Sequence, residues 1–285
     1  EDFLSWKEKF KSIPEEWLRL DTVKGFVDGI ISARTAAMLE PYSDAAAVKG
    51  EPQYTQDKLN DLVLSANRQG LTVALHAIGD RAVSMAMSSY VRTRGLLFNS
   101  RLRNRIEHLE IVPAHIYSKF SEKNIIASVQ PSHMVYDNEA LNYNDQRLGR
   151  ARSQNTFAWN NFLKEKAHIA FGTDWPVMPL DPMIGLMAAV YRQHYNLKPS
   201  SGWLPNQRIK MDPALDAYTL GGAYATREEH VKGTIREGKY ADLVVLDRDL
   251  FKSSSKELLN TKVIYTIVAG KIVFDGSQPQ FNPAK

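Results

Sequence analysis

Short apolar runs alternate with longer amphipathic stretches between about residues 20 and 175 of the chain. The apolar runs have the length and residue types of β-strands, and the stretches between them have helical spacing. The predicted strands are 22–28, 72–78, 104–108, 125–130 and 168–173, and the predicted helices between them are 56–69, 80–94, 113–123 and 155–166. This alternation predicts βα units around a parallel sheet, with Asp80 as a helix cap and Pro113 as a first-turn proline.

The remaining third of the chain has a different pattern. Two Asp-Pro pairs, at Asp181 and at Asp212, predict helices that run to about residues 191 and 224, with the acid as the N-cap and proline at the first position. From Val231 the sequence is β-rich, with a glycine turn between two alternating runs, so we expect two domains, 1–230 and 231–285. Residues 136–152 are rich in polar side chains and predict a long loop.

Composition excludes several classes of protein. The 285 residues are 44% hydrophobic and 24% charged, which is typical of a chain with a sizeable core, and no apolar run reaches the length of a membrane span. The net charge of +4 is spread along the chain, so we expect neither a nucleic-acid nor a membrane partner. Because there is no cysteine, disulfides, thiolate metal sites and a cysteine nucleophile are excluded. The compartment stays open: the cytoplasm is the first expectation, and the periplasm and secretion are alternatives.

Candidate chemistry lies on the predicted strands. His76, His108 and Asp174 come at the ends of the second, third and fifth strands, and Lys24 lies within the first. Each has an ordinary structural interpretation, since such histidines often only form hydrogen bonds and an Asp after a strand is usually a turn residue. The carboxyl ends of parallel strands share one face, however, so the four can converge. Together they favour a hydrolase site for zinc, manganese or iron.

Five strings in order extend this interpretation to a family. They are KGFVDGIISARTAAMLEPYSD, ALHAIGDRAV, RNRIEHLEI, FGTDWPV and GTIREGKYADLVVLD. The chain resembles the YtcJ-like branch of the amidohydrolase superfamily, which also contains the N-substituted formamide deformylases. The resemblance implies a metal-bearing (β/α)8 TIM-type barrel with a small β-sandwich built from both ends of the polypeptide. On that fold the five strands would be strands 4 to 8, followed by one portion of the sandwich.

The resemblance also implies roles for the strand residues. His76 and His108 would be metal ligands, and Asp174 would be both a ligand and the proton shuttle. Lys24 matches a lysine that bridges two metals when carboxylated, and burial would suit it to this reaction by favouring the neutral amine. The implied cofactor is a divalent metal, zinc first, with one or two ions in a complete enzyme.

Other residues of these strings are candidates for substrate binding, with a structural role of about equal weight. They are Asp28, Arg34, Asp80, Gln130 and His133. Four more side chains could line an apolar pocket, although packing is their more common role: Tyr136, Trp175, Met178 and Trp203. For the remaining histidines we expect surface or packing roles: His115, His168, His194 and His230.

The sequence departs from the family pattern in one respect. The family has an H-x-H pair on its first barrel strand, and no such pair occurs in these 285 residues. Five predicted strands are also fewer than eight, and the first residue is Glu1 rather than Met. We therefore expect the C-terminal portion of a longer protein, itself inactive, that holds no metal or one ion weakly and assembles no binuclear centre with Lys24.

The function that these observations favour is metal-dependent hydrolysis of non-peptide amides or other C–N bonds of a small-molecule substrate. In the mechanism that the resemblance implies, a metal-activated hydroxide attacks the carbonyl carbon and Asp174 carries the proton to the leaving amine. The chain has no G-x-S-x-G, P-loop, G-x-G-x-x-G or H-E-x-x-H motif. Two alternatives stay open: a non-catalytic binding or regulatory protein on the same scaffold, and a flavodoxin-like open sheet. A homo-oligomer is also open.

Overall fold

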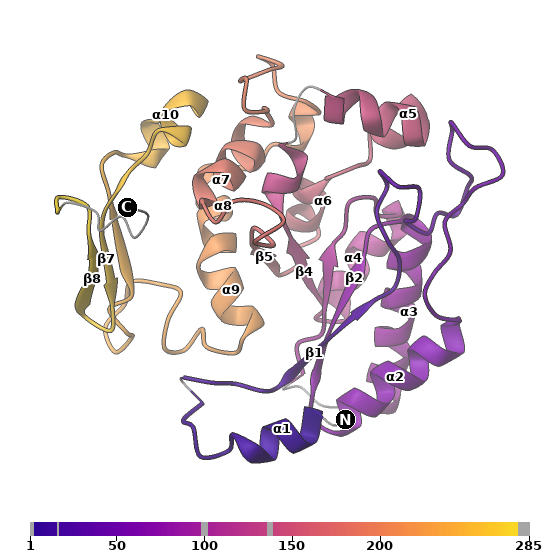
Figure 1. Cartoon of the computed structure of the whole chain (residues 1–285), viewed down its shortest axis with the longest axis horizontal. Helices are drawn as coiled ribbons and strands as arrows, with labels where there is room; N and C mark the ends of the chain where they lie inside the picture. Colours follow the sequence, from indigo (N-terminus) through magenta and orange to yellow (C-terminus); the bar gives the residue numbers. More distant parts are fainter. Residues whose placement is uncertain (1–2, 16, 98–101, 136–138, 279–285) are drawn as a thin grey trace, which may run out of the picture.

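The computed structural model describes residues 3–15, 17–97, 102–135 and 139–278 of the chain. It contains a parallel sheet of five strands in the order β1-β2-β3-β4-β5 and an antiparallel sheet of three strands in the order β6-β7-β8 (Figure 1). The parallel sheet is formed by β1 (Thr22–Phe26), β2 (Thr72–Ala77), β3 (Arg105–His108), β4 (Ile126–Val129) and β5 (Ile169–Phe171). All five strands predicted from the apolar runs are therefore present, each one to three residues shorter than predicted.

Helices and 3-10 turns connect these strands. Before β5 they are α1 (Phe3–Lys9), α2 (Gln56–Arg68), α3 (Asp80–Leu96), η1 (Ala114–Ile116), α4 (Tyr117–Glu122), η2 (Pro131–Met134), α5 (Glu139–Ser153) and α6 (Trp159–Lys164). After β5 come α7 (Pro182–Tyr191), η3 (Pro205–Gln207), α8 (Met211–Tyr218) and α9 (Leu220–Ala225). The antiparallel sheet consists of β6 (Leu243–Leu246), β7 (Val263–Val268) and β8 (Lys271–Asp275), with η4 (Leu250–Lys252) and α10 (Ser255–Leu259) between its first two strands.

The two faces of the parallel sheet differ in composition. Neighbouring residues in parallel register point to the same side, and Leu75 pairs with Ile106, which pairs with Ala127. These three lie in the main core with residues of α2, α3, α4 and α6. The opposite face carries Phe26, which pairs with His76, which in turn pairs with Glu107. The apolar face thus packs the sheet against its helices, while the other face carries polar side chains that could take part in a reaction.

The β1 side of the sheet is open. Among the described residues, β1 has one strand neighbour, β2, and Phe26 is 53% exposed. A groove of about 380 Å³ follows this edge, and its mostly apolar lining includes Leu4 of α1, Val23 of β1 and Leu62 of α2. The edge is therefore both unpaired and apolar.

Several predicted element boundaries change in the structure. Most of the predicted loop 136–152 is the helix α5, although Gly149 leaves helical geometry at φ 72° and ψ 156°. A polar composition predicts a loop here, because a helix with few apolar residues leaves no clear apolar stripe in the sequence. The predicted helix 155–166 is shorter, and the predicted helix after Asp212 begins at Met211 and breaks at Thr219 into α8 and α9.

Of the three predicted helix caps, one is confirmed and two are wrong. Asp181 is the N-cap of α7 and accepts a hydrogen bond from the backbone N–H of Met183, as predicted. Asp212 lies inside the first turn of α8, whose N-cap is Lys210, so the second Asp-Pro prediction is wrong in register. Asp80 is the first residue of α3 rather than its cap, which is Gly79.

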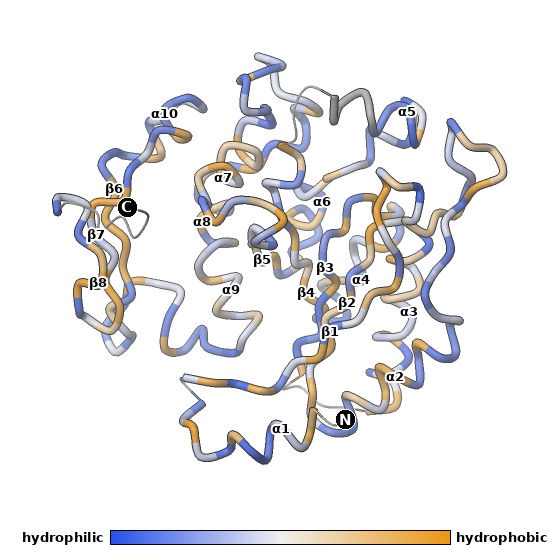
Figure 2. The backbone as a smooth tube through the Cα atoms, in the orientation of Figure 1, coloured by the Kyte–Doolittle hydropathy of each residue, from blue (hydrophilic) through white to orange (hydrophobic). Residues whose placement is uncertain are grey.

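The antiparallel sheet has apolar side chains on exposed positions. Val244, Ile272 and Val273 are 55%, 62% and 61% exposed, and Figure 2 shows these strands as largely hydrophobic. The glycine turn predicted in this β-rich segment lies at Ala269-Gly270 and joins β7 to β8. Figure 1 places this sheet beyond α8 and α9, on the side of the molecule away from β1. Within the described residues, no helix combines the length and apolarity that a membrane span needs.

Candidate metal centre

The site lies where β3, β4 and β5 end. His108 is the last residue of β3, and its backbone has a left-handed φ of 77°. Strand alternation would place its side chain opposite that of Glu107, but this turn brings the His108 ring within 4.4 Å of the His76 ring, centroid to centroid. Asp174 follows β5 in another left-handed conformation, φ 59°. Non-glycine residues rarely adopt this conformation, and it is concentrated at functional sites.

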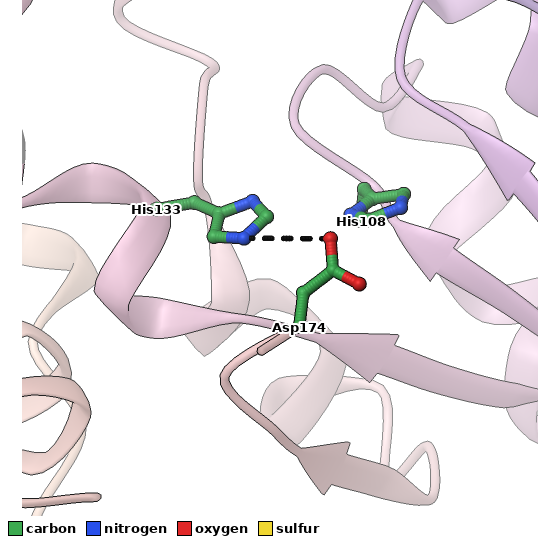
Figure 3. A group of neighbouring side chains, drawn as sticks. All are labelled: His108, His133 and Asp174. Carbon is green, nitrogen blue, oxygen red and sulfur yellow. Dashed lines mark ion pairs between the residues drawn. The ribbon is translucent and has the colours of Figure 1, made fainter. Parts of the chain in front are cut away.

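Three side chains from different strand ends converge. One ligand atom from each of His108, His133 and Asp174 lies within 4.8 Å of the other two, and the three side chains face one another in Figure 3. His133 Nε2 lies 3.8 Å from Asp174 Oδ2, and the rings of His133 and His108 stack at 5.6 Å. We call these three residues the ligand group. Both imidazoles are buried, whereas the Asp174 side chain is 39% exposed.

Burial controls the charge of the histidines. It is the largest cause that lowers the pKa of His108, to about 2, and the neighbouring rings of His76 and His133 lower it further. The pKa of His133 is also lowered by burial, although Asp174 opposes this shift. A neutral imidazole has a lone pair to offer, so both rings are in the state that binds a metal ion.

Two nitrogen atoms of this group form no hydrogen bond with the described residues. Within the part of the chain that the structure describes, the buried His108 Nδ1 and His133 Nε2 accept or donate no hydrogen bond. A buried polar atom without a partner costs free energy, so a ligand for these atoms would stabilise the site. Two imidazoles and a carboxylate are a donor set that suits a divalent cation such as zinc. Bonds of about 2.0–2.2 Å to a tetrahedral ion place ligands roughly 3.4 Å apart, so a modest closure would complete the fit.

His76 lies beside the ligand group but has its own contacts. Its Nε2 is 3.0 Å from the carbonyl oxygen of Gly29 and 3.6 Å from Asp28 Oδ1. Burial lowers its pKa, and the Gly29 carbonyl opposes this. The set implied by the family resemblance and the set grouped by geometry thus share His108 and Asp174 and differ in one histidine.

Lys24 differs from its predicted environment. It is the third residue of β1 rather than an end residue, and it is exposed, with Nζ 4.9 Å from the centre of the Phe26 ring. The burial that would suit Lys24 to carboxylation is therefore absent in this structure, because β1 lies at the open side of the sheet. Lys24 is nevertheless close enough to lower the pKa of both His76 and His108.

The predicted substrate-binding residues form two groups. His133 is a member of the ligand group, and Gln130 is buried beside His108, with an Oε1 atom that has no hydrogen-bond partner among the described residues. Asp28 and Asp80 instead accept hydrogen bonds from backbone N–H groups, and Arg34 binds Asp44 through two hydrogen bonds of 3.0 and 2.7 Å. The sequence pattern does not separate these groups, because all five follow strands.

The aromatic and methionine candidates for a pocket, and the remaining histidines, lie in different environments. Trp175 is 62% exposed directly after Asp174, Met178 is buried, and Tyr136 lies outside the described residues. Trp203 packs against the guanidinium of Arg192, with 5.1 Å between the ring centre and the cation. None of the other described histidines joins the ligand group; His168 stacks on Tyr224 at 3.8 Å.

Glu110 is a residue that sequence reasoning missed. It lies two residues after His108, and burial raises its pKa to about 8, with a further contribution from Asp28. The signal in the sequence was the acid that follows His108 in the string RIEHLE, which could equally have been an exposed turn residue.

Comparisons with known proteins agree with the geometry. The chain is 32% identical to Protein LONG AFTER FAR-RED 3 of Arabidopsis thaliana, 27% to YtcJ of Bacillus subtilis (strain 168) and 25% to the N-substituted formamide deformylase of Arthrobacter pascens. These alignments cover 92%, 95% and 92% of this chain but 44%, 50% and 47% of the relatives. A crystal structure of an uncharacterized metal-dependent hydrolase from Pyrococcus furiosus matches with a TM-score of 0.72 and 31% identity, over 87% of this chain and 50% of that one.

Residues 1–274 match the model of the amidohydrolase family, and the chain belongs to this family. The match extends from α1 to β8, so it includes the parallel sheet, the ligand group and nearly all of the antiparallel sheet. The chain spans about half the length of the curated relatives and of the solved structure that it matches.

Proposed function

We propose that this chain provides the metal-binding half of an amidohydrolase that cleaves non-peptide amide or other C–N bonds of a small molecule. The observation that carries the proposal is the ligand group: ligand atoms of His108, His133 and Asp174 lie within 4.8 Å of one another, and two buried ring nitrogens form no hydrogen bond in the described part of the chain. These three residues would hold a divalent cation, zinc first, and His76 lies beside them as a further ligand. Carboxylation of Lys24 stays a prediction.

The bound cation would supply an activated water and polarise the carbonyl oxygen of the substrate. The chain's own residues would do the rest. Asp174 is the most exposed member of the ligand group, so its carboxylate can reach both solvent and a substrate bound at the carboxyl ends of the strands. It would take a proton from the attacking water and deliver it to the leaving nitrogen, which is general acid–base catalysis. The buried histidines would stay neutral and keep their positions.

The fold supports a division of labour between two halves. We infer that β1 to β5 are strands 4 to 8 of a (β/α)8 barrel, and that β6 to β8 are one portion of a β-sandwich. The domain boundary at residue 230 is part of this proposal. The open apolar edge of β1 and the exposed apolar side chains of β6 to β8 support it, because both surfaces gain stability when another strand or sheet covers them. The relatives are about twice as long as this chain, which supports the same inference.

Metal loading followed by an assay tests the function. The complete protein that contains this chain is freed of metal with a chelator, loaded with Zn²⁺, and offered a series of N-substituted formamides and other non-peptide amides, with release of the amine as the measurement. Formamides come first because one relative is named a deformylase of N-substituted formamides. Zinc-dependent amine release that disappears in His108→Ala supports the proposal. Zinc bound at other residues, with no effect of His108→Ala on binding or turnover, contradicts it.

A further inference from the structure

Asp28 occupies an unusual position for a carboxylate. It lies on the loop directly after β1 and is only 2% exposed. Its two oxygens accept three hydrogen bonds from backbone N–H groups, those of Ala37 at 2.9 Å, Ile78 at 3.1 Å and Gly79 at 2.8 Å. Ala37 belongs to its own loop, while Ile78 and Gly79 belong to the loop after β2. One buried side chain therefore joins two adjacent βα loops.

The same carboxylate faces a histidine on the strand between these loops. His76 Nε2 is 3.6 Å from Asp28 Oδ1 and 3.0 Å from the carbonyl oxygen of Gly29, the residue after Asp28. A carbonyl oxygen can only accept a hydrogen bond, so Nε2 must carry the proton that it shares with Gly29. In a neutral ring the lone pair is then on Nδ1. Asp28 and Gly29 together fix both the direction and the tautomer of the His76 ring.

We propose that Asp28 is a positioning residue, which holds the His76 ring in one orientation and one tautomer at the edge of the metal site. Histidines near metals commonly donate their second N–H to a carboxylate or carbonyl group, and this fixes the ring before the ion arrives. Asp28 does so indirectly, by holding the loop that bears Gly29, and directly, by placing negative charge near Nε2. The role depends on the metal-dependent function proposed above, but the state of the ring does not.

The matched control for Asp28 is Asp80. Its carboxylate also accepts backbone N–H groups, those of Leu39 at 2.7 Å and Arg81 at 2.9 Å, and it also ties the loop after β1 to the start of α3. No contact joins it to His76 among the described residues. Asp28→Asn and Asp80→Asn thus both weaken loop anchoring, and only the first alters the surroundings of His76.

The test combines nitrogen NMR with zinc binding, on the full 285-residue chain labelled with ¹⁵N-histidine at pH 8. A His76→Gln variant identifies the His76 signals. We expect the unmodified chain to show a protonated Nε2 and a bare Nδ1 on this ring. In Asp28→Asn we expect a mixture of tautomers and a Zn²⁺ affinity about 10- to 100-fold lower, the usual effect of losing a residue that orients a ligand. In Asp80→Asn we expect neither change.

Three results would overturn the positioning role. The first is an Asp28→Asn chain with an unchanged His76 tautomer and zinc affinity. The second is an equal loss in Asp28→Asn and Asp80→Asn, which would leave loop anchoring as the whole effect. The third is a bare Nε2 in the unmodified chain, and this measurement does not depend on any variant folding. If the unmodified chain binds no zinc, the proposed function fails, while the tautomer comparison still decides whether Asp28 positions His76.

Discussion

Two groups of polar residues stand at the same ends of the parallel sheet and have opposite hydrogen-bonding states. The ligand group has buried ring nitrogens on His108 and His133 without partners in the described chain. We call Asp28 and Asp80 the loop anchors; their carboxylates accept three and two backbone hydrogen bonds, respectively. The buried ring nitrogens of the ligand group are therefore available to bind a metal ion, whereas the carboxylates of the loop anchors are already bound to the backbone of the chain.

This difference separates function from architecture better than location does. All of these residues follow strands, so all were plausible contacts for a substrate. Burying a polar atom costs about 1–3 kcal/mol when it has no partner, and a fold tolerates this where a ligand is bound. Because the carboxylate of Asp28 already accepts three backbone hydrogen bonds, it has little remaining capacity to bind a substrate. The comparison makes separate predictions for each group.

The largest effect should come from Asp174→Asn. The amide keeps the size of the side chain and one coordinating oxygen but cannot accept the proton, so kcat of the complete enzyme on any amide that it cleaves should fall by about 100- to 10,000-fold. Metal content measured by elemental analysis should stay near that of the unmodified protein. A variant with normal kcat and bound metal would place Asp174 among the structural residues.

Zinc binding should depend almost as strongly on the ligand group. His108→Ala should lower the affinity by more than about 100-fold, because loss of a supporting residue alone costs 10- to 100-fold. The exposed His115 of η1 offers the control, and His115→Ala should bind as before. Titration calorimetry gives both values. His76→Ala and His133→Ala in the same series would rank the two other histidines: His133 belongs to the ligand group, and His76 lies beside it as the proposed further ligand.

The largest effect on stability should come from the junction where Asp28 accepts the backbone N–H groups of Ala37 and Gly79. A Cβ atom on Gly79 would lie 2.2 Å from the carbonyl oxygen of Ala37, in the junction that Asp28 holds. Overpacking of this kind costs about 1–3 kcal/mol, so Gly79→Ala should lower the free energy of unfolding by that amount. Gly222 of α9 has open space around it, and Gly222→Ala should stabilise by up to about 1 kcal/mol. Urea unfolding of both variants is the measurement; a silent Gly79→Ala would mean that the junction is loose.

The smallest effect should follow a change at Arg34. This side chain was a candidate for substrate binding, but its guanidinium shares Asp44 with Arg147, and these cations lower the pKa of Asp44 to about 2. Exposed ion pairs contribute little to stability. Arg34→Ala should therefore leave KM unchanged and lower Tm only slightly. A clear rise in KM with normal Tm would return Arg34 to the substrate site.

The sequence predicted the parallel sheet well, because apolar runs and strand order follow from local pattern. It also predicted that His108 and Asp174 would meet, since the ends of parallel strands share one face. It could not predict that His133 joins them, because this depends on the η2 turn after β4. It gave Lys24 a buried environment, because the openness of the β1 edge is a property of the sheet and has no local signal. The α5 helix was missed because its surface pattern is polar.

The open edge of β1 has a consequence for handling the chain. An unpaired strand edge presents a row of free N–H and C=O groups, and here an apolar groove runs beside it. Natural proteins usually protect such edges with charge, proline or a covering segment, since an uncovered edge recruits other strands. Lys24 is the one charged side chain within β1. We expect concentration-dependent self-association of the chain through this strand, so its solubility would report how well the edge is covered.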